Sequence, residues 1–157
     1  MKELHTMLRK LLVALALNIL IPSVNVMTAS ASTTKPNCGI IQGPNPAWQA
    51  DICTYLTHDT YERGWQGNTK MSGTRNGTRA ILQIVSTALY IDGRLAWNSS
   101  GTSRNAPPQA IIFNNTVFYL CSGKHTFEAK SNYKVFWPNG DVTNGLQSSG
   151  KVTAGCS

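Results

Sequence analysis

The sequence predicts an all-β fold, either a small disulfide-stapled antiparallel β-sandwich or a small barrel. Three observations support this prediction. Runs rich in β-branched and aromatic residues recur from Ala80 onward, separated by Gly, Asn, Asp and Pro at intervals of about 8–12 residues. Several runs alternate apolar and polar side chains, which is the periodicity of a half-buried strand. Four cysteines, an even number, are available to cross-link this short chain.

The first 31 residues have the three parts of a secretory signal peptide. A basic start up to Lys10 precedes the apolar run Leu11–Ile21, and the segment ends in Ala29-Ser30-Ala31. This run is too short to cross the roughly 30 Å hydrocarbon core as a helix, and no later segment is apolar enough to do so. We therefore expect cleavage after Ala31 and a secreted, extracellular product with no membrane span. The form of the leader is typical of a Gram-positive bacterium.

The mature chain has 126 residues, which suits one domain. We expect an extended arm over 32–45 and a single β domain over 46–157. The mature chain carries 11 Lys and Arg against 6 Asp and Glu. This excess is compatible with anionic partners, but the basic residues are scattered along the sequence. Charge that serves solubility is therefore the simpler interpretation, and we expect no nucleic-acid partner.

All four cysteines follow the predicted cleavage site, and an even number in an exported chain predicts two disulfides. Three pairings are possible, and the sequence alone does not choose between them. We favour Cys38–Cys53 and Cys121–Cys156, because each half of the molecule then holds one bridge. Each bridge would stabilise the fold by about 3–4 kcal/mol in the chain-entropy model. The chain has no Cys-x-x-Cys spacing, so we expect no metal and no cofactor.

The segment Pro46–Tyr61 is ambiguous. Its apolar residues recur at helical spacing behind an Asn-Pro start, whereas its many Thr and Tyr residues favour a strand. We favour the strand. Gly64–Gly77 contains four glycines and several Asn and Ser residues, which predicts a loop.

Asp92-Gly93 is the clearest hairpin signal, because it separates the apolar run Ala80–Ile91 from Arg94–Trp97. A type I′ turn needs positive φ at both central residues, and this dipeptide supplies them readily. The polar segment Asn98–Pro108 then predicts a loop.

Asn114-Asn115 has a similar place and predicts a second hairpin, between Ala110–Phe113 and Thr116–Cys121. The remaining predictions for the C-terminal part are, in order, strands at His125–Lys130 and Tyr133–Trp137, a turn at Pro138–Asp141, a loop at Gly145–Gly150 and a closing strand at Lys151–Gly155.

The tripeptide Tyr119-Leu120-Cys121 resembles the Tyr-x-Cys signature near the end of immunoglobulin-like sandwiches. The resemblance covers three residues. It departs from the family pattern because more than thirty residues follow, where one strand should remain. It therefore implies an immunoglobulin-like architecture and assigns no activity.

The mature chain has only two histidines, His58 and His125. Together with Asp59 or Glu62 as a partner they could form the acid–base pair of a small basic ribonuclease, and Arg63 or Arg79 could hold a phosphate. No local motif of such an enzyme is present, and no Gly-x-Ser-x-Gly nucleophile elbow occurs. A mixed-charge surface loop accounts for the same residues, so we expect no enzymatic activity.

Aromatic residues give the best indication of binding, since they can stack on sugar rings or anchor a protein interface. Trp65 is flanked by glycines in the predicted loop, so we expect it to be exposed and to make the central contact. Tyr61, Arg63 and Trp48 complete the predicted binding set.

These observations favour a secreted, non-enzymatic binding module that recognises an extracellular protein or a cell-wall carbohydrate. Two alternatives stay open at this stage. One is a small antibacterial toxin of the bacteriocin kind, which export, size, charge and disulfides would suit. The other is the ribonuclease-like enzyme. The sequence does not indicate an oligomeric state.

Overall fold

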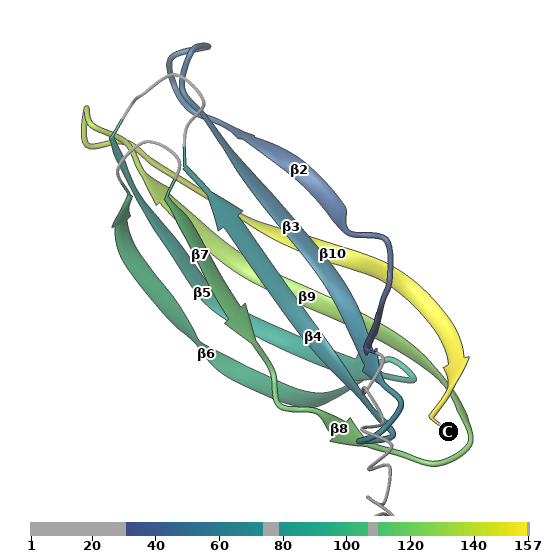
Figure 1. The fold of residues 1–157 in the computed structure, drawn as a ribbon. Helices are drawn as coiled ribbons and strands as arrows, with labels where there is room; N and C mark the ends of the chain where they lie inside the picture. Colours follow the sequence, from purple (N-terminus) through teal and green to yellow (C-terminus); the bar gives the residue numbers. More distant parts are fainter. Residues whose placement is uncertain (1–30, 74–78, 107–109, 157) are drawn as a thin grey trace, which may run out of the picture.

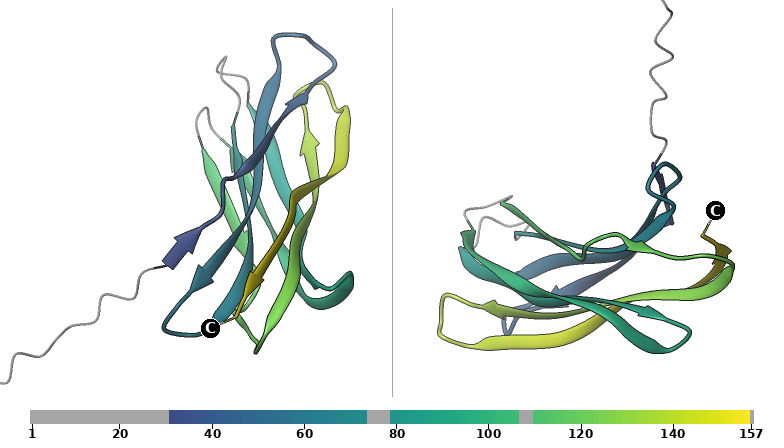
Figure 2. Two further views of the ribbon diagram at one scale, coloured as in Figure 1. Left: turned by 90° about the vertical axis from the view of Figure 1, so that its right-hand side faces the viewer. Right: turned by 90° about the horizontal axis from the view of Figure 1, so that it is seen from below.

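Two antiparallel β-sheets stack face to face in the part of the chain that is described (Figure 1 and Figure 2). The structure is a computed structural model that describes residues 31–73, 79–106 and 110–156, without the side chains of 31 and 103–106. The predicted fold class, a small disulfide-stapled antiparallel β-sandwich, is confirmed. The predicted leader falls on residues 1–30, which lie outside the described part, and on Ala31.

Sheet A has β3 and β4 at its centre. Strands β1 and β2 both pair with the outer edge of β3, and β7 and β8 both pair with the outer edge of β4. Its members are β1 (Ala31–Thr33), β2 (Asn37–Gln42), β3 (Gln49–Asp59), β4 (Gly64–Ser72), β7 (Ile111–Asn115) and β8 (Tyr119–Leu120). The segment predicted as an extended arm thus contains two strands of this sheet.

Sheet B has the order β10–β9–β5–β6. Its members are β5 (Ala80–Ile91), β6 (Arg94–Ala106), β9 (Lys124–Phe136) and β10 (Val142–Gly155). Among the described residues no helix is long and apolar enough to cross a membrane.

The strand predicted within Pro46–Tyr61 is confirmed as β3, but two predicted loops are wrong. Most of Gly64–Gly77 is β4, and Asn98–Pro108 continues β6 as far as Ala106. Strand β4 buries polar side chains at its centre, and β6 is an edge strand with a solvated face. Neither segment therefore has the apolar alternation by which a strand is recognised, and pairing with a neighbouring strand overrides the local preference.

The Asp92-Gly93 turn is confirmed, since φ is 51° at Asp92 and 79° at Gly93. The hairpin predicted at Asn114-Asn115 is wrong. Those residues end β7, and the chain continues in the same direction to β8, so that both strands pair with β4 (Figure 1). The backbone N–H of Thr116 bonds the carbonyl of Gly67 between the two strands, which keeps the chain on that course.

Near the C-terminus, two predicted strands merge into one. His125–Lys130 and Tyr133–Trp137 both belong to β9, apart from Trp137, which follows its end. The turn at Pro138–Asp141 is confirmed. The predicted loop Gly145–Gly150 is instead part of β10, where only a local shift in register separates it from the closing strand at Lys151–Gly155.

Both predicted disulfide pairings are confirmed. Cys38–Cys53 links directly opposite residues of β2 and β3, with Cα atoms 4.0 Å apart. Cys121–Cys156 links the end of β8 in sheet A to the end of β10 in sheet B. Two intramolecular disulfides indicate that the protein folds in an oxidising compartment.

The core consists of two apolar clusters, one toward each end of the sandwich. The first comprises Ile41, Ala50, Ile52, Met71, Ala80, Leu82, Ile84, Ile112, Val135 and Trp137. The second comprises Leu56, Trp65, Leu89, Phe127, Ala129 and Cys156.

A belt of buried hydroxyl and amide groups separates the two clusters. Along β3, Thr54 lies between Ile52 of the first cluster and Leu56 of the second. The belt crosses from sheet to sheet, because Thr54 Oγ1 lies 3.0 Å from Ser131 Oγ on β9. Its other buried members are Thr69, Thr87 and Asn114.

The belt is a connected hydrogen-bond chain. Thr69 Oγ1 bonds both Ser131 Oγ and Thr87 Oγ1, the latter at 2.7 Å. Asn114 Nδ2 donates to Thr87 Oγ1 at 3.1 Å, and Ser99 on the edge strand β6 donates to Asn114 Oδ1 at 3.2 Å. Each buried hydroxyl and amide group of the belt therefore has a partner, as a dry interior requires.

Candidate interaction surface

The four residues predicted to bind do not form one surface. Tyr61 and Arg63 lie in the turn between β3 and β4, and Tyr61 is 75% exposed. Trp48 lies at the opposite end of β3, where its ring stacks on buried Trp137 with centroids 6.2 Å apart. The 11-residue length of β3 separates Trp48 from Tyr61.

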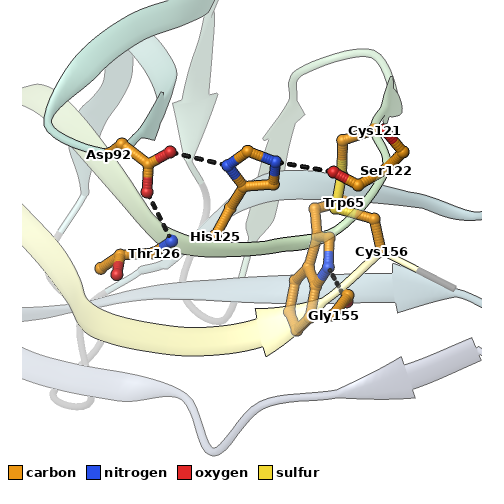
Figure 3. The surroundings of a disulfide bond; sticks show 8 residues. All are labelled: Trp65, Asp92, Cys121, Ser122, His125, Thr126, Gly155 and Cys156. Carbon is orange, nitrogen blue, oxygen red and sulfur yellow. Dashed lines mark hydrogen bonds and ion pairs between the residues drawn. A yellow bond between two sulfur atoms is a disulfide. The ribbon is translucent and has the colours of Figure 1, made fainter.

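Trp65 is buried, so the prediction that it is exposed is wrong. Only 5% of the residue is accessible, and its ring stacks on Phe127 at 4.6 Å. Its indole Nε1 donates to the carbonyl of Gly155 at 3.2 Å (Figure 3). The glycines beside Trp65 belong to a strand and not to a loop, and alternation along β4 turns this side chain toward sheet B.

The two histidines do not form the acid–base pair considered from the sequence. The His58 ring lies tilted against Trp65 with centroids 4.8 Å apart, and His125 makes an edge contact with Phe127 at 6.2 Å. Since Trp65 and Phe127 stack on each other, their two rings lie between the histidines.

His125 instead joins the turn between β5 and β6 to the start of β9. Its Nδ1 lies 2.6 Å from Asp92 Oδ2, and its Nε2 lies 2.8 Å from the carbonyl of Ser122 (Figure 3). Both ring nitrogens therefore face acceptors, and only the doubly protonated imidazolium can donate to both. The other oxygen of Asp92 accepts the backbone N–H of Thr126 at 2.9 Å.

The electrostatics agree with this geometry. The hydrogen bond to Asp92 raises the pKa of His125 above 6.5, and the carbonyl of Ser122 raises it further. The hydrogen bond from His125 lowers the pKa of Asp92 below 3.8, with the Thr126 N–H acting in the same direction. A histidine whose two ring nitrogens are both engaged is a structural clasp, not a free general base.

The link from β8 to β9 is fastened at several further points. Cys121 is bonded to Cys156, and the N–H of Cys156 donates to the carbonyl of Gly123 at 3.0 Å. The Trp65 indole holds the neighbouring Gly155. This end of the sandwich, next to β8, is therefore rigidly built.

Exposed apolar side chains gather beside that end. Among the described residues, thirteen large apolar side chains are exposed, and seven of them lie on β6, β7, β8 or the short link between the last two. We call this set the apolar edge. It comprises Leu95, Trp97, Ile111, Phe113, Val117, Tyr119 and Leu120.

The residues of the apolar edge lie on neighbouring strands at one side of the molecule. Strands β7 and β8 follow one another along the edge of β4, and β6 is the edge strand of sheet B and lies against β7. Trp97 pairs with Leu89 and Tyr119 pairs with Trp65. Because Leu89 and Trp65 share one core cluster, Trp97 and Tyr119 lie at the same level of the sandwich.

Strand β7 shows an inversion of the usual burial pattern. Asn114 and the following Thr116 are buried, whereas Ile111, Phe113 and Val117 are 41%, 52% and 49% exposed. In most half-buried β-strands the polar side chains face water and the apolar side chains face the core. In β7 the inward-facing Asn114 belongs to the polar belt, so the apolar side chains on either side of it face outward.

This surface was not predicted from the sequence, because apolar residues are expected in the core. The available signal was the alternation itself. Side chains alternate between the two faces of a strand, so Asn114 and Thr116 lie on the same inner face as buried Ile112. Phe113 therefore lies on the outer face. Reading that signal requires knowing which face is buried, and the pairing with β4 decides it.

No group of three or more His, Cys, Asp or Glu side chains that could hold a metal ion occurs among the described residues. The chain matches no family model, no curated protein and no solved structure.

Proposed function

We propose that this protein is a secreted binding module that recognises an extracellular protein through the apolar edge. The observation that carries the proposal is the inverted pattern of β7, which leaves Phe113 and its neighbours in water while polar groups are buried. Contiguous exposed apolar side chains mark interaction sites on soluble proteins. Aromatic residues such as Trp97 and Tyr119 are typical anchors of protein interfaces.

The rigidity of the neighbouring end supports the same proposal. The disulfide at Cys121 and the clasp at His125 hold the chain that follows Leu120. A surface that is already ordered loses little conformational entropy when a partner binds. The edge strand β7 also offers backbone groups to which a partner strand can add.

Secretion is supported by the composition of the first 31 residues and by the two disulfides. A basic n-region, an apolar run and a small-residue cleavage site direct a chain to export. Residues 32–157 would then be the functional form in the extracellular space.

A capture experiment with a matched control tests the proposal. The mature chain is immobilised and exposed to the producer's secreted proteins, as wild type, as Phe113→Ser/Leu120→Ser and as Val142→Ser/Leu146→Ser. The control pair lies on β10 and is 45% and 59% exposed, against 52% and 65% for the edge pair. The two variants thus remove similar exposed apolar groups from different sides of the molecule.

We expect the same captured protein on the wild type and the β10 variant, and a reduction of at least about tenfold on the edge variant, since interface anchors commonly contribute more than 1 kcal/mol each. Unchanged unfolding midpoints would show that all three chains are folded. Equal capture by the edge variant, or equal loss by the β10 variant, would exclude the apolar edge as the binding surface.

A further inference from the structure

The outer faces of the two sheets differ in charge. Four lysines, Lys124, Lys130, Lys134 and Lys151, lie on strands β9 and β10 of sheet B, with Glu128 as the acidic residue of the same strands. On the strands of sheet A, the described charged side chains are Asp51, Asp59 and Lys70. Sheet B therefore has a formal charge of +3 over these two strands, and sheet A has −1 over all of its described strands.

Strand register places the four lysines on one face. Phe127, Ala129, Ser131 and Val135 of β9 are buried between the sheets, so the even-numbered residues of this strand point outward. Lys151 pairs with Glu128, which puts it on the same outer face. Basic residues that are scattered in the sequence thus lie on one face, because all three lysines of β9 are at even-numbered positions.

Most of this charge is available to a ligand. Lys130 lies 3.5 Å from Glu128 and 4.8 Å from the ring centroid of Tyr90, so it is already engaged. Lys124, Lys134 and Lys151 are exposed, and Glu128 is the only acidic side chain on the described strands of sheet B. Lys130 and Lys134 are about 13 Å apart along the strand, from its rise per residue.

Short polar side chains lie on the same face between the lysines, beside Tyr90 and exposed Leu146. Asn132 Nδ2 donates to Ser86 Oγ at 3.1 Å, and the hydroxyls of Thr126 and Thr153 lie 2.9 Å apart. Amides and hydroxyls both donate and accept, which suits the many hydroxyl groups of a sugar chain.

We infer that the outer face of sheet B binds an extended anionic polysaccharide, with Lys124, Lys134 and Lys151 contacting its carboxylates and the neighbouring amides and hydroxyls contacting its sugar hydroxyls. The charge of the face is complementary to such a polymer. This surface is separate from the apolar edge, and the inference does not depend on the proposed protein partner.

The composition of the face favours a polysaccharide over single-stranded nucleic acid. Single-stranded nucleic acid is usually bound by exposed aromatic rings on which bases stack. The exposed aromatic side chains described here, Trp97, Phe113 and Tyr119 among them, lie on the apolar edge, apart from Tyr61 in the β3–β4 turn. A membrane surface would be bound by basic residues combined with apolar side chains that insert. Exposed Ile81, Val142 and Leu146 lie on the strands that flank β9 on this face, so anionic vesicles are one arm of the test below.

The test is affinity electrophoresis of the mature chain in gels containing polygalacturonate, with the fully methyl-esterified polymer as the neutral counterpart. One variant carries Lys124→Gln, Lys134→Gln and Lys151→Gln. The control carries Lys35→Gln, Lys70→Gln and Arg79→Gln, which remove the same three charges from positions outside sheet B's outer face. Lys130 is kept in both, because of its contacts with Glu128 and Tyr90.

We expect polygalacturonate to retard the wild type and the control similarly, and the sheet B variant to bind at least about tenfold more weakly, given the contribution of each lysine near a dense anionic surface. The esterified polymer should not retard any chain. Equal weakening in both variants, no retardation by polygalacturonate, or tighter binding to single-stranded DNA or anionic vesicles would overturn the inference. A chain carrying Phe113→Ser/Leu120→Ser should still bind the polymer, which separates this result from the proposed function.

Discussion

At the residue scale, two side chains show how environment decides a role. Trp65 and Trp97 are the same residue type, yet Trp65 is 5% exposed and Trp97 is 44% exposed. Trp65 stacks on Phe127 and bonds Gly155, which ties β4 to the end of β10. Trp97 lies on the edge strand β6, which pairs with β5 alone.

Trp65→Ala is therefore expected to destabilise the fold by about 3–5 kcal/mol, the usual cost of removing a buried aromatic ring. Trp97→Ala should have a much smaller effect, within about 1.5 kcal/mol. Denaturant unfolding with the disulfides intact measures both. Equal effects of the two substitutions would contradict the burial assigned to Trp65.

The clasp at His125 makes a prediction about pH. Because the folded-state pKa of His125 is raised, its stabilisation is complete below about pH 6.5 and is lost as pH rises through the folded-state pKa. The pKa of Asp92 is lowered, so its stabilisation is complete above about pH 4 and is lost as pH falls through the folded-state value. The pair contributes fully between those limits.

Asp92→Asn isolates this effect. Asparagine tolerates the positive φ of 51° at position 92, and its Oδ1 can still accept the N–H of Thr126. The side-chain NH2 of the asparagine takes the place of Asp92 Oδ2, which accepts the hydrogen bond from His125 Nδ1. The imidazolium therefore loses this acceptor. Titration of the His125 ring by NMR should give a pKa above 6.5 in the wild type and a lower one in the variant. An unchanged pKa would show that the carboxylate does not hold the proton on His125.

At the element scale, β6 shows how a strand can form without an apolar signal. It pairs with β5 from Arg94 to Ala106, although its sequence is mostly Ser, Asn, Thr and Gly. Gly101 lies opposite Val85 at a very close approach of the two backbones. A Cβ atom added at Gly101 would lie 1.8 Å from the carbonyl oxygen of Ile84 and 2.4 Å from that of Val85.

Gly101→Ala should consequently force the two strands apart and destabilise the protein by at least about 2 kcal/mol, which is above the typical effect of a surface substitution. Ser100→Ala, one position earlier and exposed, is the matched control and should change stability by less than about 0.5 kcal/mol. Amide hydrogen exchange would locate the damage in β5 and β6. Equal stability of the two variants would contradict the close approach.

The sequence predicted the elements whose signals are local. Asp92-Gly93 specifies its own turn, and the disulfides follow from cysteine number and position. The long strands β4 and β6 could not be predicted, since their many polar and glycine residues lack the apolar alternation by which a strand is recognised. The proposed binding surface could not be predicted because whether Phe113 or Asn114 is buried depends on the belt that Asn114 joins across the sandwich.

At the scale of the whole molecule, the buried belt links the interior to the surface. Its hydroxyl chain fixes how the two sheets are placed over each other, because Thr54 and Thr69 of sheet A bond Ser131 of sheet B. The belt also requires a polar side chain, Asn114, on the inner face of β7, and the neighbouring Phe113 therefore faces outward. The belt and the apolar edge are thus two consequences of one pattern.

Thr87→Val tests the belt with little change in shape. The valine would leave the buried amide of Asn114 and the hydroxyl of Thr69 without their bonds to Thr87. We expect a loss of about 1–3 kcal/mol in the free energy of unfolding, the penalty for an unsatisfied buried polar group. Thr153→Val removes an exposed hydroxyl contact and should change stability by less than about 0.5 kcal/mol. A neutral Thr87→Val would mean that the belt does not stabilise the sandwich.

The most direct test of the central claim is site-specific photo-crosslinking. A photoreactive phenylalanine analogue is placed at Phe113 on the apolar edge in one chain and at Leu146 on β10 in another, and each is irradiated with the producer's secreted proteins. Both positions are more than half exposed, at 52% and 59%. A defined adduct with one secreted protein from position 113 only is the predicted result. The same adducts from both positions, or none from position 113, would contradict a protein-binding role for the apolar edge.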